Sequence, residues 1–138
     1  MKSHIFIVST ILAFYGSCTN DIKTNNDTQY GSFLKKHGVE FRLYAPNSSN
    51  VELIIFEKFD DNDGLAYQMT KDDVGNWKLY LEDQGVGTMY GYRLEGPFNN
   101  DSLIIADPYS KAAITQNTWR HVAKTLVIDE SFEWEGDT

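Results

Sequence analysis

The sequence predicts an all-β fold, an antiparallel β-sandwich built from short strands. In several segments apolar and polar residues alternate with period two, as in strands that have one buried face. Turns rich in Gly, Asn and Asp separate these segments at short intervals. No convincing amphipathic helix pattern lies between them, so we expect two sheets that share one apolar filling.

The first two predicted strands differ in how their apolar residues are arranged. In Val39–Tyr44, "VEFRLY", apolar residues alternate with polar ones, and Pro46 ends the run, as proline does at a strand edge. In Val51–Phe56, "VELIIF", Ile54 and Phe56 add a second apolar face to the first. A strand of this kind is expected to be buried on both faces, or to meet another domain.

Three further segments complete the predicted sandwich. Leu65–Asp72 is expected to be a short strand, and Trp77–Glu82 alternates again. Thr88–Leu94 leads to a stop at Gly96-Pro97 and is expected to be a central strand. The residues predicted to face the core are Trp77, Leu79 and Leu81 in one strand and Tyr90, Tyr92 and Leu94 in the other.

Size and composition fit one packed domain. The chain has 138 residues, 41% of them hydrophobic, which is enough for one core and too little for two domains. Its formal net charge of −8 argues against a nucleic-acid partner, because phosphate neutralisation requires a basic surface. The single cysteine leaves no internal disulfide, so packing must hold the domain together.

The first residues have the pattern of an export signal. Lys2 precedes the apolar run Ile5–Phe14, which is too short to span a bilayer comfortably. Small residues at 16–17 then precede Cys18, which resembles the lipobox of bacterial lipoproteins, although Tyr15 departs from that pattern. We therefore expect a leader over residues 1–17, lipidation of Cys18 and membrane anchoring on the periplasmic side or at the cell surface. An ordinary signal peptide is the alternative.

Three segments in order carry a family resemblance: "GVEFRLYAPNSSNVELIIF", "GNWKLYLEDQGVGTMYGYRLEGP" and "ADPYSKA". Together they resemble the early-set, immunoglobulin-like module, a family-48 carbohydrate-binding module, that precedes the catalytic barrel in family-13 glycoside hydrolases. Pullulanases, isoamylases and branching enzymes contain it. The likeness covers Gly38–Gly136, and it is clearest to type I pullulanases, which cut α-1,6 branch points.

The resemblance implies a domain organisation and a role. Residues 18–37 are expected to be a flexible tether, 38–124 the β-sandwich and 125–138 the start of a linker to a missing catalytic barrel. Such a barrel takes about 200 residues or more, so this chain is expected to carry no catalytic residues and to be inactive alone. The parent protein would be an O-glycosyl hydrolase, with the module bracing its barrel.

The Asp-Pro-Tyr corner has a physical role of its own. Pro108 fixes its own φ and biases Asp107 away from helix, so the chain must turn there, and Tyr109 can pack its ring beyond the turn. The resemblance implies that this corner lies close to the catalytic domain. Phe132 and Trp134, aromatics among acids, are expected to belong to the same interface.

Direct sugar binding would require exposed aromatic rings. Starch- and glycogen-binding members of the resembled family use two tryptophans and a lysine. Here Phe59 and Phe98 stand near the tryptophan positions, and Gly91 stands where the lysine would be. Phe98 and Phe59 are therefore the only candidate glucan platforms, for starch, glycogen or pullulan.

No metal or cofactor is expected. The acidic run Asp60–Gly64 lacks the ligand spacing of a calcium loop, and His37 and His121 are isolated. Two other functions stay open besides the debranching-enzyme module. One is a free-standing α-glucan-binding lipoprotein, which would be retained on amylopectin by itself. The other is a generic immunoglobulin-like structural domain with no connection to glucans.

Overall fold

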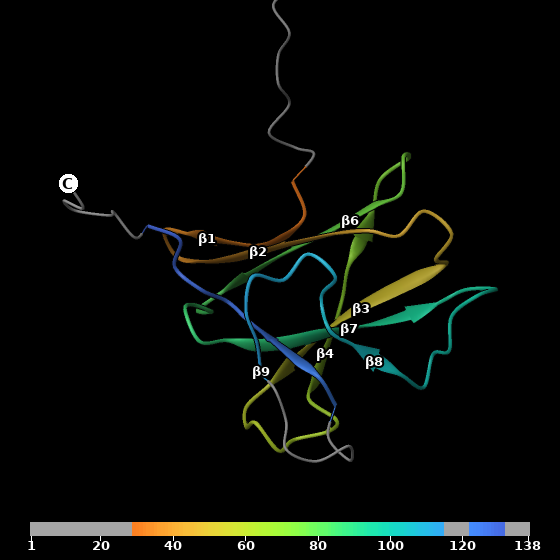
Figure 1. Cartoon of the computed structure of the whole chain (residues 1–138). Coiled ribbons are helices and arrows are strands. Elements are labelled where there is room, and N and C mark those ends of the chain that lie inside the picture. The colour runs from red at the N-terminus through yellow and green to blue at the C-terminus, as the bar shows by residue number, and fades with distance from the viewer. Residues whose placement is uncertain (1–28, 115–121, 132–138) are drawn as a thin grey trace, which may run out of the picture.

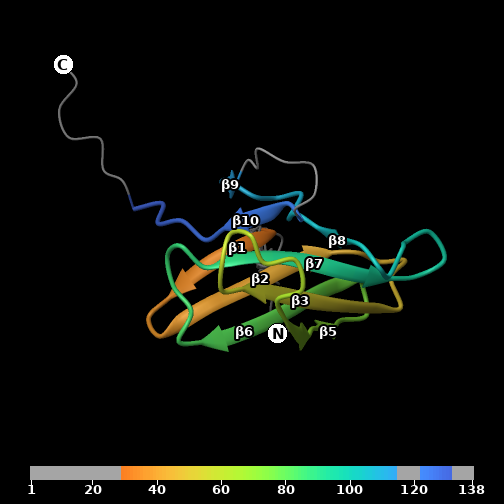
Figure 2. The same ribbon diagram turned by 90° about the horizontal axis from the view of Figure 1, so that it is seen from below.

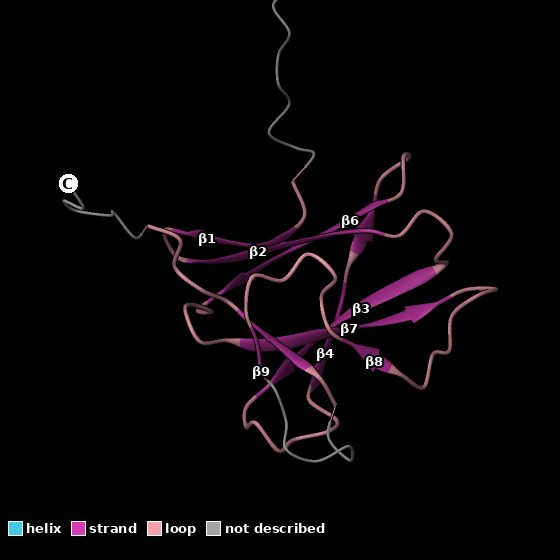
Figure 3. Cartoon of the chain, viewed as in Figure 1, coloured by secondary structure: helices cyan, strands magenta, loops and turns pink. Residues whose placement is uncertain are grey.

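The computed structural model describes residues 29–114 and 122–131, and this part of the chain folds into strands and loops (Figures 1 and 3). In these residues we find no helix with the length and apolarity needed to cross a membrane. The strands are β1 (Gly31–Lys35), β2 (Gly38–Tyr44), β3 (Asn50–Phe56), β4 (Leu65–Gln68), β5 (Thr70–Lys71), β6 (Asn76–Glu82), β7 (Met89–Glu95), β8 (Ile104–Ile105), β9 (Ala113–Ile114) and β10 (Lys124–Leu126).

The strands form two sheets that face each other. The smaller sheet has the order β1-β2-β6-β5, and the larger has the order β4-β3-β7-β10-β9, with β8 paired to β7. All of these pairings are antiparallel. Figures 1 and 2 show the smaller sheet packed across the larger one. The predicted antiparallel β-sandwich is confirmed.

The core lies between the two sheets and consists mainly of the residues that the alternating pattern assigned to it. The ring of Phe41 meets that of Tyr90 edge-on, with centroids 4.9 Å apart. Trp77 is buried as predicted, and its indole Nε1 donates a hydrogen bond of 3.0 Å to the carbonyl oxygen of Ala45. The central core residues are Val39, Phe41, Leu43, Val51, Leu53, Ile55, Trp77, Tyr90, Tyr92 and Val127.

The segment Leu65–Asp72 does not form the single strand that we expected. Its first half, β4, pairs with β3 in the larger sheet, and its second half, β5, pairs with β6 in the smaller one. Between them Met69 is buried and its backbone N–H donates to the carbonyl of Val51 at 3.1 Å. The chain therefore crosses from one sheet to the other at Met69.

The folded body is longer than the expected sandwich of residues 38–124. Strand β1 lies within the stretch expected to be a tether, and its residues Gly31–Lys35 pair along their whole length with β2. At the other end, Thr125 and Val127 are buried although they fall in the expected linker. The first extension forms a hairpin with β2, the next strand in sequence, whereas the second depends on β7, about 30 residues away.

Candidate functional site

Asp107 anchors the Asp-Pro-Tyr corner inside the sandwich. Its side chain is only 3% exposed, and its Oδ2 accepts a hydrogen bond of 2.7 Å from the hydroxyl of Tyr90. Its Oδ1 accepts one of 2.8 Å from the backbone N–H of Tyr109, and its own N–H donates to Oγ1 of Thr125 at 2.9 Å. Tyr90 and Thr125 are register partners in β7 and β10, so the middle of the larger sheet fixes the corner.

The electrostatics of this anchor favour a structural role. Burial raises the pKa of the Asp107 carboxyl, and the hydrogen bonds from Tyr90 and Tyr109 oppose that rise. Burial and the nearby Asp107 charge also raise the pKa of Tyr90 above its ordinary value. Both carboxyl oxygens already have donors within the chain, so Asp107 is a hydrogen-bonded support rather than a free acid or base.

The outer side of the corner carries Tyr109, which is 41% exposed, and the exposed Pro108. The ring of Tyr109 lies 4.9 Å from that of Tyr30, centroid to centroid. Beside it Gly31 has φ of +112°, and a Cβ there would lie 3.3 Å from the carbonyl oxygen of Tyr109. Glycine thus lets the start of β1 approach the corner closely.

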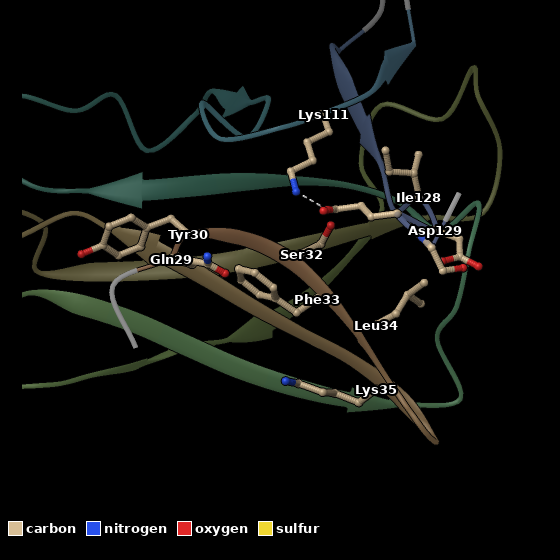
Figure 4. A pocket seen from close by; sticks show the side chains of 11 residues that line it. Gln29, Tyr30, Ser32, Phe33, Leu34, Lys35, Lys111, Ile128 and Asp129 are labelled. Carbon is tan, nitrogen blue, oxygen red and sulfur yellow. Dashed lines mark hydrogen bonds and ion pairs between the residues drawn. The ribbon is translucent and has the colours of Figure 1, made fainter. Parts of the chain in front are cut away.

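An open groove of about 580 Å³ adjoins the corner (Figure 4). Its walls are the outer edge of β1, with Phe33 and Leu34, and the segment 128–131, with Ile128. Lys111, two residues after Tyr109, forms an ion pair with Glu130 on the rim. We call this groove together with Pro108, Tyr109 and Lys111 the corner surface.

The two candidate sugar platforms, Phe59 and Phe98, are both exposed, at 65% and 86%. They lie at opposite ends of the β3–β7 pair. Phe59 follows the end of β3 that pairs with Met89, and Phe98 follows the end of β7 that pairs with Asn50. Those ends are six residues apart, about 20 Å along a strand, so the two rings cannot belong to one compact site.

Phe98 lies at a shallow apolar dish. The dish has a volume of about 130 Å³ and combines the ring with aliphatic side chains and two amides. Its lining residues are Leu94, Phe98, Asn99, Asn100, Leu103 and Ile105. An apolar floor with a few polar groups at the edge is an ordinary composition for a small-molecule site.

The remaining residues singled out in the sequence are Cys18, two aromatics near the C-terminus and the acidic turn. Cys18, Phe132 and Trp134 lie outside the described residues. Asp61, in the acidic turn, accepts hydrogen bonds at Oδ1 from the backbone N–H groups of Asp63 and Gly64, at 3.1 and 3.5 Å. Within residues 29–114 and 122–131, no three His, Cys, Asp or Glu side chains are grouped so that they could hold a metal ion.

The sequence did not lead us to expect the burial of two charged residues, Asp107 and Lys124. The burial of Asp107 had a weak signal, because an aspartate before proline commonly accepts a hydrogen bond from a backbone N–H two residues on. The full burial of Lys124 in β10 had none, since lysine is almost never buried and its partners are distant in sequence.

The chain is similar to one part of several glycogen debranching enzymes. It is 27% identical to the glycogen debranching enzyme of Yersinia enterocolitica, over 84% of this chain and 21% of that protein. It is 26% identical to the corresponding enzyme of Serratia proteamaculans, over 78% of this chain and 20% of that protein. The chain thus spans about a fifth of the length of these relatives.

Comparison with solved structures also finds enzymes of which this chain resembles one part. The pullulanase of Bacillus acidopullulyticus superposes with a TM-score of 0.61 at 26% identity, over 73% of this chain and 12% of that one. The pullulanase of Paenibacillus barengoltzii, in complex with maltohexaose and α-cyclodextrin, gives 0.61 at 26% identity, over 74% and 15%. A sequence model of one protein family matches residues 28–110, which are more than half of the chain. The chain therefore belongs to the family described as carbohydrate-binding module 48, the isoamylase N-terminal domain.

Proposed function

We propose that this chain is the non-catalytic module of a debranching α-glucan hydrolase, in which it braces the catalytic barrel. Family membership supports this role, as do the names of the relatives, of which the chain spans about a fifth. The parent protein would act on α-1,6-glucosidic bonds, and this chain alone would not hydrolyse pullulan.

The observation that carries the proposal is the anchored corner. Asp107 binds the middle of the larger sheet, so Tyr109 and Lys111 are held in fixed positions beside the groove. Rigid presentation of an exposed aromatic and a cation lowers the entropy cost of forming an interface. The corner surface is therefore the part of the chain best suited to receive a catalytic domain.

A chimera tests this role. Residues 29–131 of this chain would replace the matching module of the Bacillus acidopullulyticus pullulanase, and thermal inactivation would be compared with that of the enzyme lacking any module. We expect the chimera to keep its activity to a higher temperature than the enzyme without a module. Tyr109→Ala should remove most of this increase in inactivation temperature. Tyr80→Ala, similarly exposed at 44% but on β6, is the control. A chimera no more stable than the deleted enzyme would contradict the proposal.

Direct α-glucan contact is the second candidate function, at Phe98 and at Phe59. The dish around Phe98 and the exposure of both rings support it, because sugar rings stack on aromatic faces. We expect the 138-residue chain to be retarded in gels containing glycogen. Phe98→Ala should reduce the retardation and Tyr80→Ala should not. Equal mobility with and without glycogen would exclude this function.

We also propose that the protein is exported and lipid-anchored through Cys18. The apolar run Ile5–Phe14 and the small residues before Cys18 support this. In a bacterial host, labelled fatty acid should be incorporated into the wild-type chain and not into Cys18→Ala. Labelling of the variant, or of neither protein, would contradict lipidation at this residue.

A further inference from the structure

Lys124 is a fully buried lysine on the larger sheet, at 0% exposure. Its Nζ donates hydrogen bonds to the carbonyl oxygens of Phe59, at 2.9 Å, and Val122, at 3.4 Å. The same atom lies 4.5 Å from the centroid of the Phe56 ring. Burying an ammonium group is costly unless it is compensated, so these contacts are needed to keep it in place.

The loop that Lys124 holds, residues 57–64, lies directly on the outer face of β3. Ile54 and Phe56 on that face are 0% and 3% exposed, although they are not part of the core between the sheets. At the end of the loop Gly64 has φ of +61°, and a Cβ there would lie only 2.6 Å from Cγ2 of Ile54. The end of the loop therefore packs against the apolar outer face of β3, where Lys124 also lies over the ring of Phe56.

A second tie joins the same two segments. Oδ1 of Asn62 accepts a hydrogen bond of 3.2 Å from the backbone N–H of Val122. Asp60 and Asp61, also in the loop, add electrostatic attraction for the ammonium group of Lys124. The loop is thus connected at Phe59 to Lys124 of β10 and at Asn62 to Val122, which lies just before β10. Phe59 is held through its backbone carbonyl, and the residue is 65% exposed.

We propose that Lys124 is a positioning residue that holds the loop 57–64 against the larger sheet and so presents the ring of Phe59 to an α-glucan chain. This inference rests on the proposed glucan contact. Stacking of a sugar ring requires an aromatic face in a fixed orientation, and an untethered loop would lose that advantage to conformational entropy. Lys124 acts through the carbonyl oxygen of Phe59 and does not itself touch sugar.

The test uses the full chain with variants at both ties. Lys124→Met removes the ammonium group while it keeps an unbranched side chain, and Lys124→Arg keeps the charge. Asn62→Ala removes the second tie at an exposed residue, so its fold should survive even if Lys124→Met fails to fold. Asn47→Ala, at an exposed asparagine in the turn between β2 and β3 and outside both candidate glucan sites, is the matched control.

Hydrogen exchange and glycogen affinity are the two readouts. In Lys124→Met and in Asn62→Ala we expect the amides of residues 57–64 to exchange about tenfold faster or more. Glycogen affinity should fall about two- to tenfold in both, recover in Lys124→Arg, and stay unchanged in Asn47→Ala. Phe59→Ala should lower affinity by a similar factor, and Phe59→Ala with Lys124→Met should bind no more weakly than Phe59→Ala alone.

The outcomes distinguish a failure of the positioning role of Lys124 from a failure of the proposed glucan contact. Unchanged exchange in both Lys124→Met and Asn62→Ala would overturn the positioning role. So would a loss of affinity in Lys124→Met that persists in the Phe59→Ala background, because Lys124 would then act elsewhere. A wild-type chain that does not bind glycogen would instead refute the glucan contact, and the positioning role would fall with it, whatever the exchange rates show.

Discussion

Two tyrosines on β7 are both fully buried, but the hydrogen bonding of their hydroxyl groups differs. Tyr90 donates to Asp107 at 2.7 Å. The hydroxyl of Tyr92, two residues on, is buried without a hydrogen-bond partner in the described part of the chain. A buried polar atom without a partner costs free energy, whereas a satisfied one contributes only modestly. At this scale the environment of a residue decides its role, because the two side chains are chemically identical.

Removing each hydroxyl should therefore have opposite consequences. Tyr90→Phe leaves Oδ2 of Asp107 buried without its donor and should lower the free energy of unfolding by about 1–3 kcal/mol. Tyr92→Phe removes an unsatisfied group and should be neutral or stabilising by up to about 1 kcal/mol. Urea unfolding with a constant m-value measures both. Equal destabilisation by the two substitutions would contradict the assigned hydrogen bonds.

The protonation of Asp107 gives a second test at this scale. Burial raises the pKa of its carboxyl in the folded chain above the unfolded value of about 3.9, so the folded state binds more protons between the two values. Its contribution to stability is then present at low pH and lost as pH rises through the folded pKa. The difference in unfolding free energy between wild type and Asp107→Asn should shrink from pH 4 to pH 7. A difference that grows with pH would mean that the pKa is lowered.

Among the strands, length determined what the sequence could predict. β2, β3, β6 and β7 each have seven residues, long enough to show a period-two pattern, and their inward faces were predicted. β8, β9 and β10 have two or three residues, too few to show any period. The partners of Asp107 and Lys124 were unpredictable for a related reason. They depend on which strands lie side by side, and that is a property of the whole fold.

The unexpected strand β1 yields a prediction about truncation. Removing residues 1–28 should leave the free energy of unfolding nearly unchanged. Removing residues 1–37 also deletes β1, exposes the edge of β2 and uncovers apolar surface, and should cost about 2–4 kcal/mol. Urea midpoints of the two truncated chains measure the difference. Equal midpoints would mean that β1 is a tether after all.

In the molecule as a whole, burial on both sides of one sheet connects the two proposals. The inner face of β3 packs in the core of the sandwich, and its outer face contacts Lys124 and the end of the loop 57–64. The larger sheet therefore supports the Asp107 corner from its inner side and the Phe59 loop from its outer side. β10 takes part in both, through Thr125 at the corner and Lys124 at the loop, so damage to β10 should affect both surfaces.

Charge is the remaining property that belongs to the whole chain. Twenty acidic residues against twelve basic ones give the formal net charge of −8. Repulsion among these charges disfavours the compact state, whereas exposed ion pairs such as Lys111–Glu130 contribute about 1 kcal/mol at most. Screening weakens both effects, and the repulsion should dominate because the acidic excess is large. Raising NaCl from 10 to 300 mM should therefore increase the free energy of unfolding, by about 1 kcal/mol. A decrease would show that ion pairs, rather than net repulsion, dominate the electrostatics of this domain.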